Sequence, residues 1–369
     1  MNNIIFVFAL MLSPSCLAQI TFNSDEEIIA FINSNQSSWT AGVNFRGQDE
    51  SDLLPLFNGV LGLHPDPNFV IPQVFHDTSK MYLPATFDAR TNWPECADII
   101  GNILNQGQCG SCWAFATSEV MSDRLCIQNK ARVKVQLSPQ DLITCCSTCG
   151  SKCNGGYPST AFRYWDMTGI VSGGDYLSNS GCKPYGATEF KDGVATECQK
   201  TCTNPSYKTP YDKDKRFGTT YYQVGVVASQ IQAEIFAKGS VTAVFTVYED
   251  FSFYKTGVYY HAYGAIRGRH SVKIIGWGVD NGLPYWLVAN SWGKKWGGLG
   301  GFFKILRGYN HCGIEQQILG ANARIYFKNT EISEKSETKE CITPSSAVKH
   351  SGRALLFLTV SFFLISGFP

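Results

Sequence analysis

The sequence predicts an α+β fold built from two lobes, and three observations indicate it. A chain of 369 residues can bury a large core, for which two domains or lobes are the usual arrangement. Residues 113–124 lack Gly and Pro and favour a helix, and a second helical, Cys-rich segment follows from Ser138-Pro139. The later part carries alternating, strand-like runs at residues 241–248, 257–261, 271–277, 285–289 and 301–306. Helices followed by strands are typical of α+β proteins, and a cleft between the lobes is the usual place for a site.

The composition narrows the class of protein. Net charge is +1 and the isoelectric point is about 7.4, so no electrostatic argument favours nucleic acid as a partner. Fourteen cysteines are many for an intracellular enzyme and indicate an oxidising compartment.

The first 82 residues differ from the rest of the chain. Residues 4–12 are apolar and are followed by the small residues Cys16 and Ala18, which predicts a signal peptide over residues 1–18. A membrane anchor is the alternative, but the run is too short to span a bilayer. Residues 19–82 contain no Cys, and Ser24 precedes an acidic first turn typical of a helix start.

The candidate catalytic stretch is residues 105–115, NQGQCGSCWAF. Two glycines and several polar residues suit an irregular loop that runs into the predicted helix, so Cys112 lies at its first turn. Unpaired backbone N–H groups at a helix start stabilise a thiolate, which attacks a carbonyl carbon far better than a thiol does.

This stretch resembles the active-site segment of papain-like cysteine proteases, whose pattern C-G-[SA]-C-[WY] is met by residues 109–113. The pattern needs a distant His and Asn. His270, ahead of the run IIGWG, and Asn290, which begins NSWG, supply them. Both lie further from Cys112 than the roughly 130–150 residues typical of papain. Insertions of this kind, and the segments LPATFDAR, CNGGYP and HCGIE at residues 83–90, 153–158 and 311–315, resemble the cathepsin B branch.

The resemblance implies a papain-like two-lobe fold, with a helical lobe, a β-barrel-like lobe and the active-site cleft between them. Residues 83–328 would form the protease domain, and residues 19–82 a short propeptide that inhibits the zymogen. A folded N-terminal extension that stays attached is the alternative for the latter.

Roles follow from the same resemblance. Cys112 would be the nucleophile and His270 its acid and base, oriented by the Asn290 carbonyl. Gln106 and the Cys112 N–H would hold the oxyanion. The alternatives are structural roles: Cys112 in a disulfide, Asn290 in a turn and Gln106 in a loop. The implied substrate-binding residues are Gly155, Gly156, Tyr157, Pro158, Val244, Arg269, Ser271, Trp292 and Gln317. No cofactor and no metal are implied.

Ten cysteines other than Cys112 lie between residues 96 and 202, an even number whose connectivity spacing cannot give. Two alternatives to disulfides are a zinc site in residues 145–153 and a redox pair of Cys109 with Cys112. The resemblance implies the pairs Cys96–Cys126, Cys109–Cys153, Cys145–Cys198, Cys146–Cys149 and Cys182–Cys202.

Two departures from the cathepsin B branch concern specificity. The branch carries an occluding loop whose two adjacent His bind a substrate carboxylate, but residues 182–202 contain no His and the loop is short. This predicts mainly endopeptidase activity, with Lys183 or Lys191 as replacement cations. Gln317 stands where the branch has an acid that accepts Arg, and Arg269 stands where it usually has Gly. We therefore expect apolar or acidic residues, rather than Arg, two positions before the cut.

Arg269 also motivates an alternative function. Because it directly precedes His270, it could disturb catalysis and leave a catalytically impaired papain-fold binding protein. For the enzyme, the expected partners are peptide and protein substrates and the chain's own propeptide, with cystatin-like inhibitors as candidates.

The C-terminal residues 329–369 form a polar spacer and a hydrophobic tail. Small residues at 345–347, a spacer over 348–353 and an apolar block over 354–365 follow the order of a glycosylphosphatidylinositol signal. The alternatives are a membrane-spanning helix, for which the block is short, and a cleaved, unanchored tail. The expected location is the secretory pathway, lysosomal or extracellular, with a candidate membrane tether.

Overall fold

The computed structural model describes residues 22–176, 178–186 and 197–326. These residues belong to one unit. The predicted signal peptide (1–18) and the whole C-terminal tail (329–369) lie outside the described residues. Within the described part of the chain, no helix is long and apolar enough to cross a membrane.

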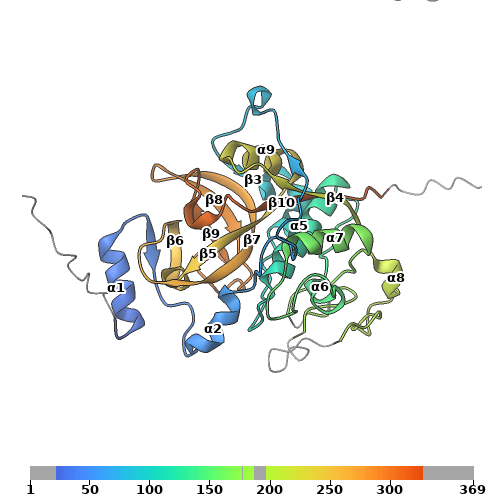
Figure 1. The fold of residues 1–369 in the computed structure, drawn as a ribbon, viewed down its shortest axis with the longest axis horizontal. Coiled ribbons are helices and arrows are strands. Elements are labelled where there is room, and N and C mark those ends of the chain that lie inside the picture. Colours follow the sequence, from blue (N-terminus) through green and yellow to red (C-terminus); the bar gives the residue numbers. More distant parts are fainter. Residues whose placement is uncertain (1–21, 177, 187–196, 327–369) are drawn as a thin grey trace, which may run out of the picture. The chain divides into compact units, whose positions relative to one another are not determined.

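A ten-stranded sheet organises the fold, with nine strands in the order β1-β6-β9-β8-β7-β5-β10-β4-β2 and β3 paired with β7 off this path (β3 to β10 are labelled in Figure 1). The N-terminal segment that the sequence predicts to be a propeptide (residues 19–82), called the propeptide from here on, supplies the strands at both ends of this order: β1 pairs antiparallel with β6, and β2 pairs parallel with β4. The sheet is not closed, so the predicted barrel-like lobe is an open sheet. The strands are β1 Trp39–Ala41, β2 Gln73–Val74, β3 Phe87–Asp88, β4 Gly218–Val224, β5 Val241–Tyr248, β6 Tyr254–Tyr259, β7 Ile266–Asp280, β8 Leu283–Ala289, β9 Phe302–Leu306 and β10 Ile318–Ala323.

The five strands expected from the sequence correspond to β5, β6, β7, β8 and β9. The alternating pattern did not predict β10, which reads ILGANA and is buried on nearly every residue because it lies between β5 and β4. Gly320 has no room for a side chain, since an added Cβ would lie 2.9 Å from the Tyr222 ring. Small residues in a strand of this kind allow neighbouring groups to approach closely.

The helix that begins at Cys112 is the central one. Its residues are buried from Cys112 to Cys126 because it packs against both β7 and α7. No face of this part of the helix is exposed to solvent, unlike the polar face of a surface helix. The predicted helix start at Ser24 is confirmed: its hydroxyl accepts the Glu27 backbone N–H. The helices are α1 Asp25–Asn35, α2 Glu50–Phe57, α3 Ala89–Asn92, α4 Ala97–Ile100, α5 Cys112–Gln128, α6 Pro139–Cys145, α7 Pro158–Met167, α8 Tyr211–Asp214 and α9 Ala228–Lys238, with 3-10 turns at Thr78–Lys80, Pro94–Cys96, Glu249–Phe253 and His311–Gly313.

Two hydrophobic cores correspond to the two lobes. One is centred on the sheet and includes Trp277 and Trp286, and the other is centred on α5 and α7 and includes Phe115 and Trp165. A third, small cluster joins Val60 of the propeptide to Cys112 and Val244. The predicted α+β architecture with two lobes is therefore present, and Cys112 lies where they meet.

Five disulfides cross-link the described residues, and their pairing is the one that the resemblance implies. All four cysteines of the alternative zinc site take part in them, and Cys109 is bonded to Cys153, not to Cys112. The disulfides are Cys96–Cys126, Cys109–Cys153, Cys145–Cys198, Cys146–Cys149 and Cys182–Cys202.

Candidate active site

Cys112 is the first residue of α5, as the sequence predicts, and its sulfur is buried. Its Sγ accepts a hydrogen bond from the Ser271 backbone N–H at 3.4 Å. Burial raises the pKa of the Cys112 thiol to about 12, and the backbone N–H groups of Ser271 and Gly59 offset only part of this effect. In this state Cys112 is a thiol.

His270 lies on β7 and is held by Asn290 at the end of β8. Its Nε2 is 2.8 Å from Asn290 Oδ1. A carbonyl oxygen can only accept, so Nε2 carries the proton and Nδ1 is the free acceptor; no described residue is a hydrogen-bond partner of Nδ1. Burial lowers the pKa of His270 to about 4, against the opposing effect of Asn290. The ring is therefore neutral near pH 7.

The resemblance implies that His270 takes the thiol proton in the active enzyme, but no hydrogen bond joins His270 to Cys112 in the structure described here. Gly59 of the propeptide lies against the sulfur: a Cβ added to it would be 2.5 Å from Cys112 Sγ. With the cleft covered, burial disfavours both the thiolate and the imidazolium, so the ion pair expected of an active enzyme is not favoured.

Gln106 is buried beside Cys112 and is fixed by its neighbours. Its Nε2 donates to the Cys109 carbonyl at 2.8 Å, and its Oε1 accepts from the Ser291 hydroxyl at 2.6 Å. An amide nitrogen has two N–H groups, so one remains for an oxyanion. Its backbone N–H also donates to the Ser291 carbonyl, which ties the loop before α5 to the segment that carries Asn290.

Trp292 covers the His270 ring, with 4.9 Å between the ring centroids. Two aromatic side chains of the propeptide, Phe45 and Phe57, pack on the Trp292 ring. In this position Trp292 shields the His270–Asn290 contact, and the propeptide extends the cover.

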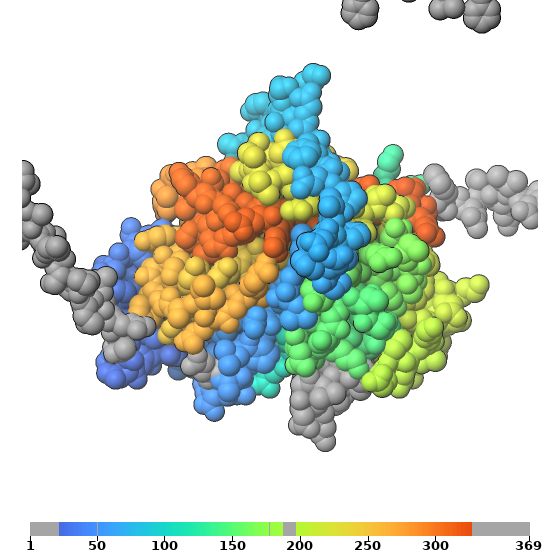
Figure 2. Space-filling model, viewed as in Figure 1, coloured from blue at the N-terminus to red at the C-terminus, as the bar shows by residue number. Residues whose placement is uncertain are grey.

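The propeptide crosses the surface between the sheet side and the helical side of the protein (Figure 2). It pairs with Gly156, whose N–H donates to the Gly59 carbonyl and whose carbonyl accepts from the Leu61 N–H. Gly156 thus offers its backbone to an extended chain, and Gly155 lies against the Leu61 side chain; pairing of substrate at these glycines stays a prediction. Pro158 does not line this surface; it is buried as the first residue of α7.

A cavity of about 590 Å³ lies further along the same path. The mature part contributes Tyr157, Gln223, Arg269 and Gln317 to its walls, and the propeptide closes it with residues between 61 and 73. Arg269 Nη2 donates to Gln317 Oε1 at 2.6 Å. The structure thus brings together two residues that the sequence assigns to one pocket.

Sequence reasoning missed Ser291 and Gln223. Ser291 lies inside the motif NSWG, between Asn290 and Trp292, so position alone could have indicated it. Gln223 lies on β4, a strand that the sequence pattern did not predict. Ser271 and Val244, which the resemblance assigns to substrate binding, contact Cys112 here, through the backbone N–H and through apolar packing respectively.

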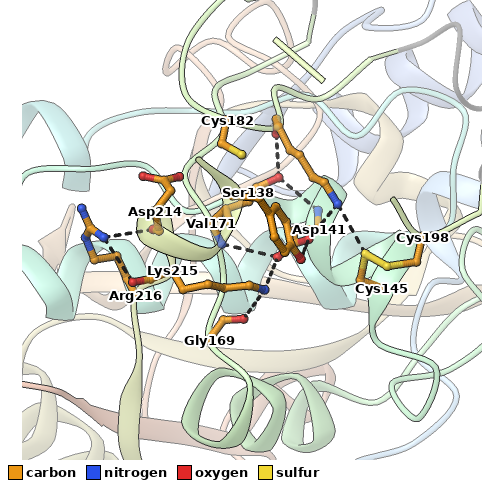
Figure 3. A network of polar contacts seen from close by, with 12 residues as sticks. Ser138, Asp141, Cys145, Gly169, Val171, Cys182, Cys198, Asp214, Lys215 and Arg216 are labelled. Carbon is orange, nitrogen blue, oxygen red and sulfur yellow. Dashed lines mark hydrogen bonds and ion pairs between the residues drawn. A yellow bond between two sulfur atoms is a disulfide. The ribbon is translucent and has the colours of Figure 1, made fainter. Parts of the chain in front are cut away.

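Lys183 is not available as a cation for substrate, which corrects the expectation from the sequence. It is buried and its Nζ lies 3.0 Å from Asp141 Oδ1. Figure 3 shows Asp141 in a polar network beside the Cys145–Cys198 disulfide, where Lys215 also binds it at 3.1 Å. Buried charges of this kind need each other as partners. Lys191 lies outside the described residues.

Comparison with known proteins agrees with this geometry. The family described as "Papain family cysteine protease" matches residues 83–321. The "Cathepsin B-like cysteine proteinase 4" of Caenorhabditis elegans is 45% identical over 318 residues, which cover 82% of this chain and 93% of that protein. The "Gut-specific cysteine proteinase" of the same organism is 51% identical over 249 residues, covering 66% and 74%.

Solved structures of precursor forms are also similar. Procathepsin B S9 from Trypanosoma congolense matches with a TM-score of 0.70 and 33% identity, over 82% of this chain and 98% of that chain. The digestive procathepsin L2 proteinase from Tenebrio molitor larval midgut matches with a TM-score of 0.62 and 26% identity, over 80% and 88%. Both are proforms, in keeping with the covered cleft described above.

Proposed function

Because the chain belongs to the papain family of cysteine proteases and is cathepsin B-like, we propose that it is a secreted zymogen whose mature form acts mainly as an endopeptidase. The observation that carries the endopeptidase proposal is that no described residue supplies an available cation at one end of the cleft. The proposal includes the catalytic roles of Cys112, His270, Asn290 and Gln106.

The reaction would begin when the propeptide leaves Cys112. Nδ1 of His270 takes the thiol proton, because Nε2 is occupied by Asn290, and the Cys112 thiolate attacks the peptide carbonyl. The free N–H of Gln106 and the Cys112 backbone N–H stabilise the oxyanion. The imidazolium then gives its proton to the leaving amine as the C–N bond breaks. Water, deprotonated by the same Nδ1, hydrolyses the thioester and regenerates the thiol.

Arg269 does not support the alternative of a catalytically impaired binding protein. Arg269 donates its hydrogen bond to Gln317, while His270 bonds to Asn290, and the pKa of His270 is set by burial and by Asn290. Consecutive residues of a strand face opposite sides, which explains why the two side chains are separated.

The endopeptidase proposal rests on the cavity beside Gln106. This cavity has a volume of about 350 Å³ and lies on the other side of Cys112 from Arg269 along the propeptide, between Gln48 and Gln106. A carboxydipeptidase needs a positive group here to bind the C-terminal carboxylate. Of the described residues, those that line it include no Lys, Arg or His, and Lys183 is bound to Asp141.

The test uses the mature enzyme, quantified by titration with an irreversible thiol-directed peptidyl inhibitor. An internally quenched peptide with both ends blocked should be cut at least as fast as a free-acid peptide loses dipeptides. The matched control is the second peptide with a C-terminal amide in place of its free carboxylate. Efficient dipeptide release that amidation abolishes would contradict the endopeptidase proposal, and absence of labelling at Cys112 would contradict the peptidase itself.

Secretion is supported by the predicted signal peptide and by the five disulfides, which persist in oxidising compartments. We extend the proposal to lysosomal or extracellular delivery and to lipid anchoring through the tail. Phosphatidylinositol-specific phospholipase C applied to intact cells should release the protease. Protein that is soluble before treatment, or retained when a control anchored protein is released, would contradict anchoring. Cystatin-like proteins remain candidate inhibitors.

A further inference from the structure

Arg269 is a partly buried cation without an anionic partner. Among the described residues it forms no ion pair, and its hydrogen bond is to the neutral amide of Gln317. Burial lowers its pKa, and no carboxylate offsets this. A guanidinium stays charged at any ordinary pH, so the cost of its partial desolvation is not compensated in the protein itself.

The cavity that Arg269 faces becomes a groove once the propeptide is removed. Its remaining walls are Tyr157, Gln223, Arg269 and Gln317, with Arg269 as the cation and no carboxylate. Asp66 of the propeptide lines the closed cavity but forms no ion pair with Arg269. The mature groove therefore presents uncompensated positive charge.

The path of the propeptide indicates how a bound chain reaches this groove. Gly59 lies against Cys112, Val60 bridges to Gly156 and packs with Cys112 and Val244, and Leu61 reaches the cavity with Arg269. Leu61 is two residues from Gly59, so an extended chain in the same path places a side chain in this cavity within two residues of the one at the nucleophile.

We propose that Arg269 makes the mature protease select an acidic side chain, preferably Glu, two residues before the scissile bond. This inference rests on the proposed function, since it concerns the specificity of the same cleft. A guanidinium has five N–H groups in a planar fork that matches a carboxylate with two parallel hydrogen bonds. The Gln317 carbonyl takes one of these N–H groups and fixes the plane of the fork, and the others remain for substrate.

The charge also disfavours the other classes of side chain. An Arg in the substrate would bring two cations together with no carboxylate between them. An apolar side chain would fill the groove but would bury the guanidinium further without a partner. Glu satisfies the cation, and its side chain, one methylene longer than that of Asp, reaches further into the groove.

The experiment compares peptidyl-coumarin substrates that differ only two residues before the scissile bond, with Glu, Gln, Leu or Arg. Glu and Gln have the same shape, so the ratio of their kcat/KM values isolates charge. We expect a Glu-to-Gln ratio of about tenfold or more in the mature enzyme. The ratio should approach one as the pH falls below about 4, where the substrate carboxylate gains its proton.

Three variants locate the effect. Arg269→Gln should bring the ratio close to one. Gln317→Glu, which supplies Arg269 with a carboxylate, should do the same, and serves if the first variant does not fold. Arg267→Gln makes the same charge change on the same strand at a residue already paired with Glu249 at 3.1 Å, and should leave the ratio unchanged.

Active-site titration distinguishes a failure of the proposed function from a failure of the acidic specificity. Enzyme that is not labelled at Cys112 contradicts the proposed function. Labelled enzyme with a ratio of one or less, a ratio that survives in Arg269→Gln, or a ratio that is lost equally in Arg267→Gln overturns the acidic specificity alone.

Discussion

Nε2 of His76 in the propeptide lies 2.7 Å from Oε2 of Glu234 on α9. Glu234 is buried and is also paired with the buried guanidinium of Arg124 at 2.9 Å. The neighbouring Gln230 donates from its amide to the His76 carbonyl. This contact joins the propeptide to the mature domain 17 residues beyond Gly59, the residue that covers Cys112.

The His76 contact should help to hold the propeptide over the cleft. We expect His76→Ala to increase the rate at which an irreversible peptidyl inhibitor labels Cys112 in the zymogen, by about tenfold, because a hydrogen bond to a charged partner is lost. The matched control is His64→Ala, whose ring bonds only to Asp66 within the propeptide. Equal rates in wild type and His76→Ala would show that this contact does not restrain the propeptide.

Glu234 should remain charged throughout the mildly acidic range. Burial raises the pKa of Glu234, but the charge of Arg124 and the hydrogen bonds of His76 and Tyr222 lower it by more. The pKa of Glu234 is therefore lowered to about 2. A lowered pKa stabilises the folded zymogen fully above about 4.5, and this stabilisation is lost as the pH falls toward 2. The difference of free energy of unfolding between wild type and Glu234→Gln, from urea titrations, should therefore be constant from pH 7 to 5 and shrink below 4.5.

The charge of Glu234 also bears on activation. Between pH 7 and 5 the carboxylate of Glu234 does not change its charge, so acidification in this range does not release the propeptide by protonating Glu234. A stability difference that disappears already between pH 7 and 5 would contradict this account.

Cys112 should be a poor nucleophile in the zymogen. Its pKa of about 12 leaves about one molecule in ten thousand as thiolate at pH 8, so alkylation by iodoacetamide should be slow and rise about tenfold per pH unit. Removal of the propeptide should raise the rate at pH 7 by at least about a hundredfold. Cys312 is also unpaired, so Cys112→Ser gives the background. The same rate before and after processing would contradict the role of burial.

Gly59 should be required for close cover of the nucleophile. A Cβ at this position would lie 2.5 Å from Cys112 Sγ and 2.8 Å from the Gly110 carbonyl oxygen, so Gly59→Ala must displace the propeptide. We expect the unprocessed Gly59→Ala zymogen to hydrolyse a small peptide substrate measurably. In the control Gly62→Ala the nearest atom would be 3.5 Å away, on the Tyr157 ring, and inhibition should persist. Full inhibition of both variants would argue against the steric role.

Gln106 should act on the transition state. Gln106→Glu keeps the shape of the side chain but replaces the N–H donors with a carboxylate. We expect kcat of the mature enzyme to fall by about 10²–10³-fold with little change in KM, as for loss of an oxyanion donor. Circular dichroism and thermal unfolding would verify the fold, since the lost bond to Cys109 is local. A variant with unchanged kcat would exclude Gln106 from the oxyanion site.

The sequence predicted those features that short stretches of chain carry. Local turn chemistry and alternation predict the loop before Cys112, the helix that begins there and the strand that continues beyond His270. The structure has all of these features. The motif around Asn290 likewise placed that residue opposite His270. The family resemblance added the disulfide pairing, which spacing alone leaves open.

Only the tertiary structure decided which charges are available and which strands form. Lys183 looks free in the sequence, yet folding buries it against Asp141, 42 residues earlier in the chain. The edge strands β1 and β2 exist because the propeptide finds unpaired sheet edges, which no local pattern encodes. The neutral state of Cys112 and His270 has the same origin. Sequence determined by itself which residues could form the catalytic group, whereas burial by a distant segment determines whether that group is charged.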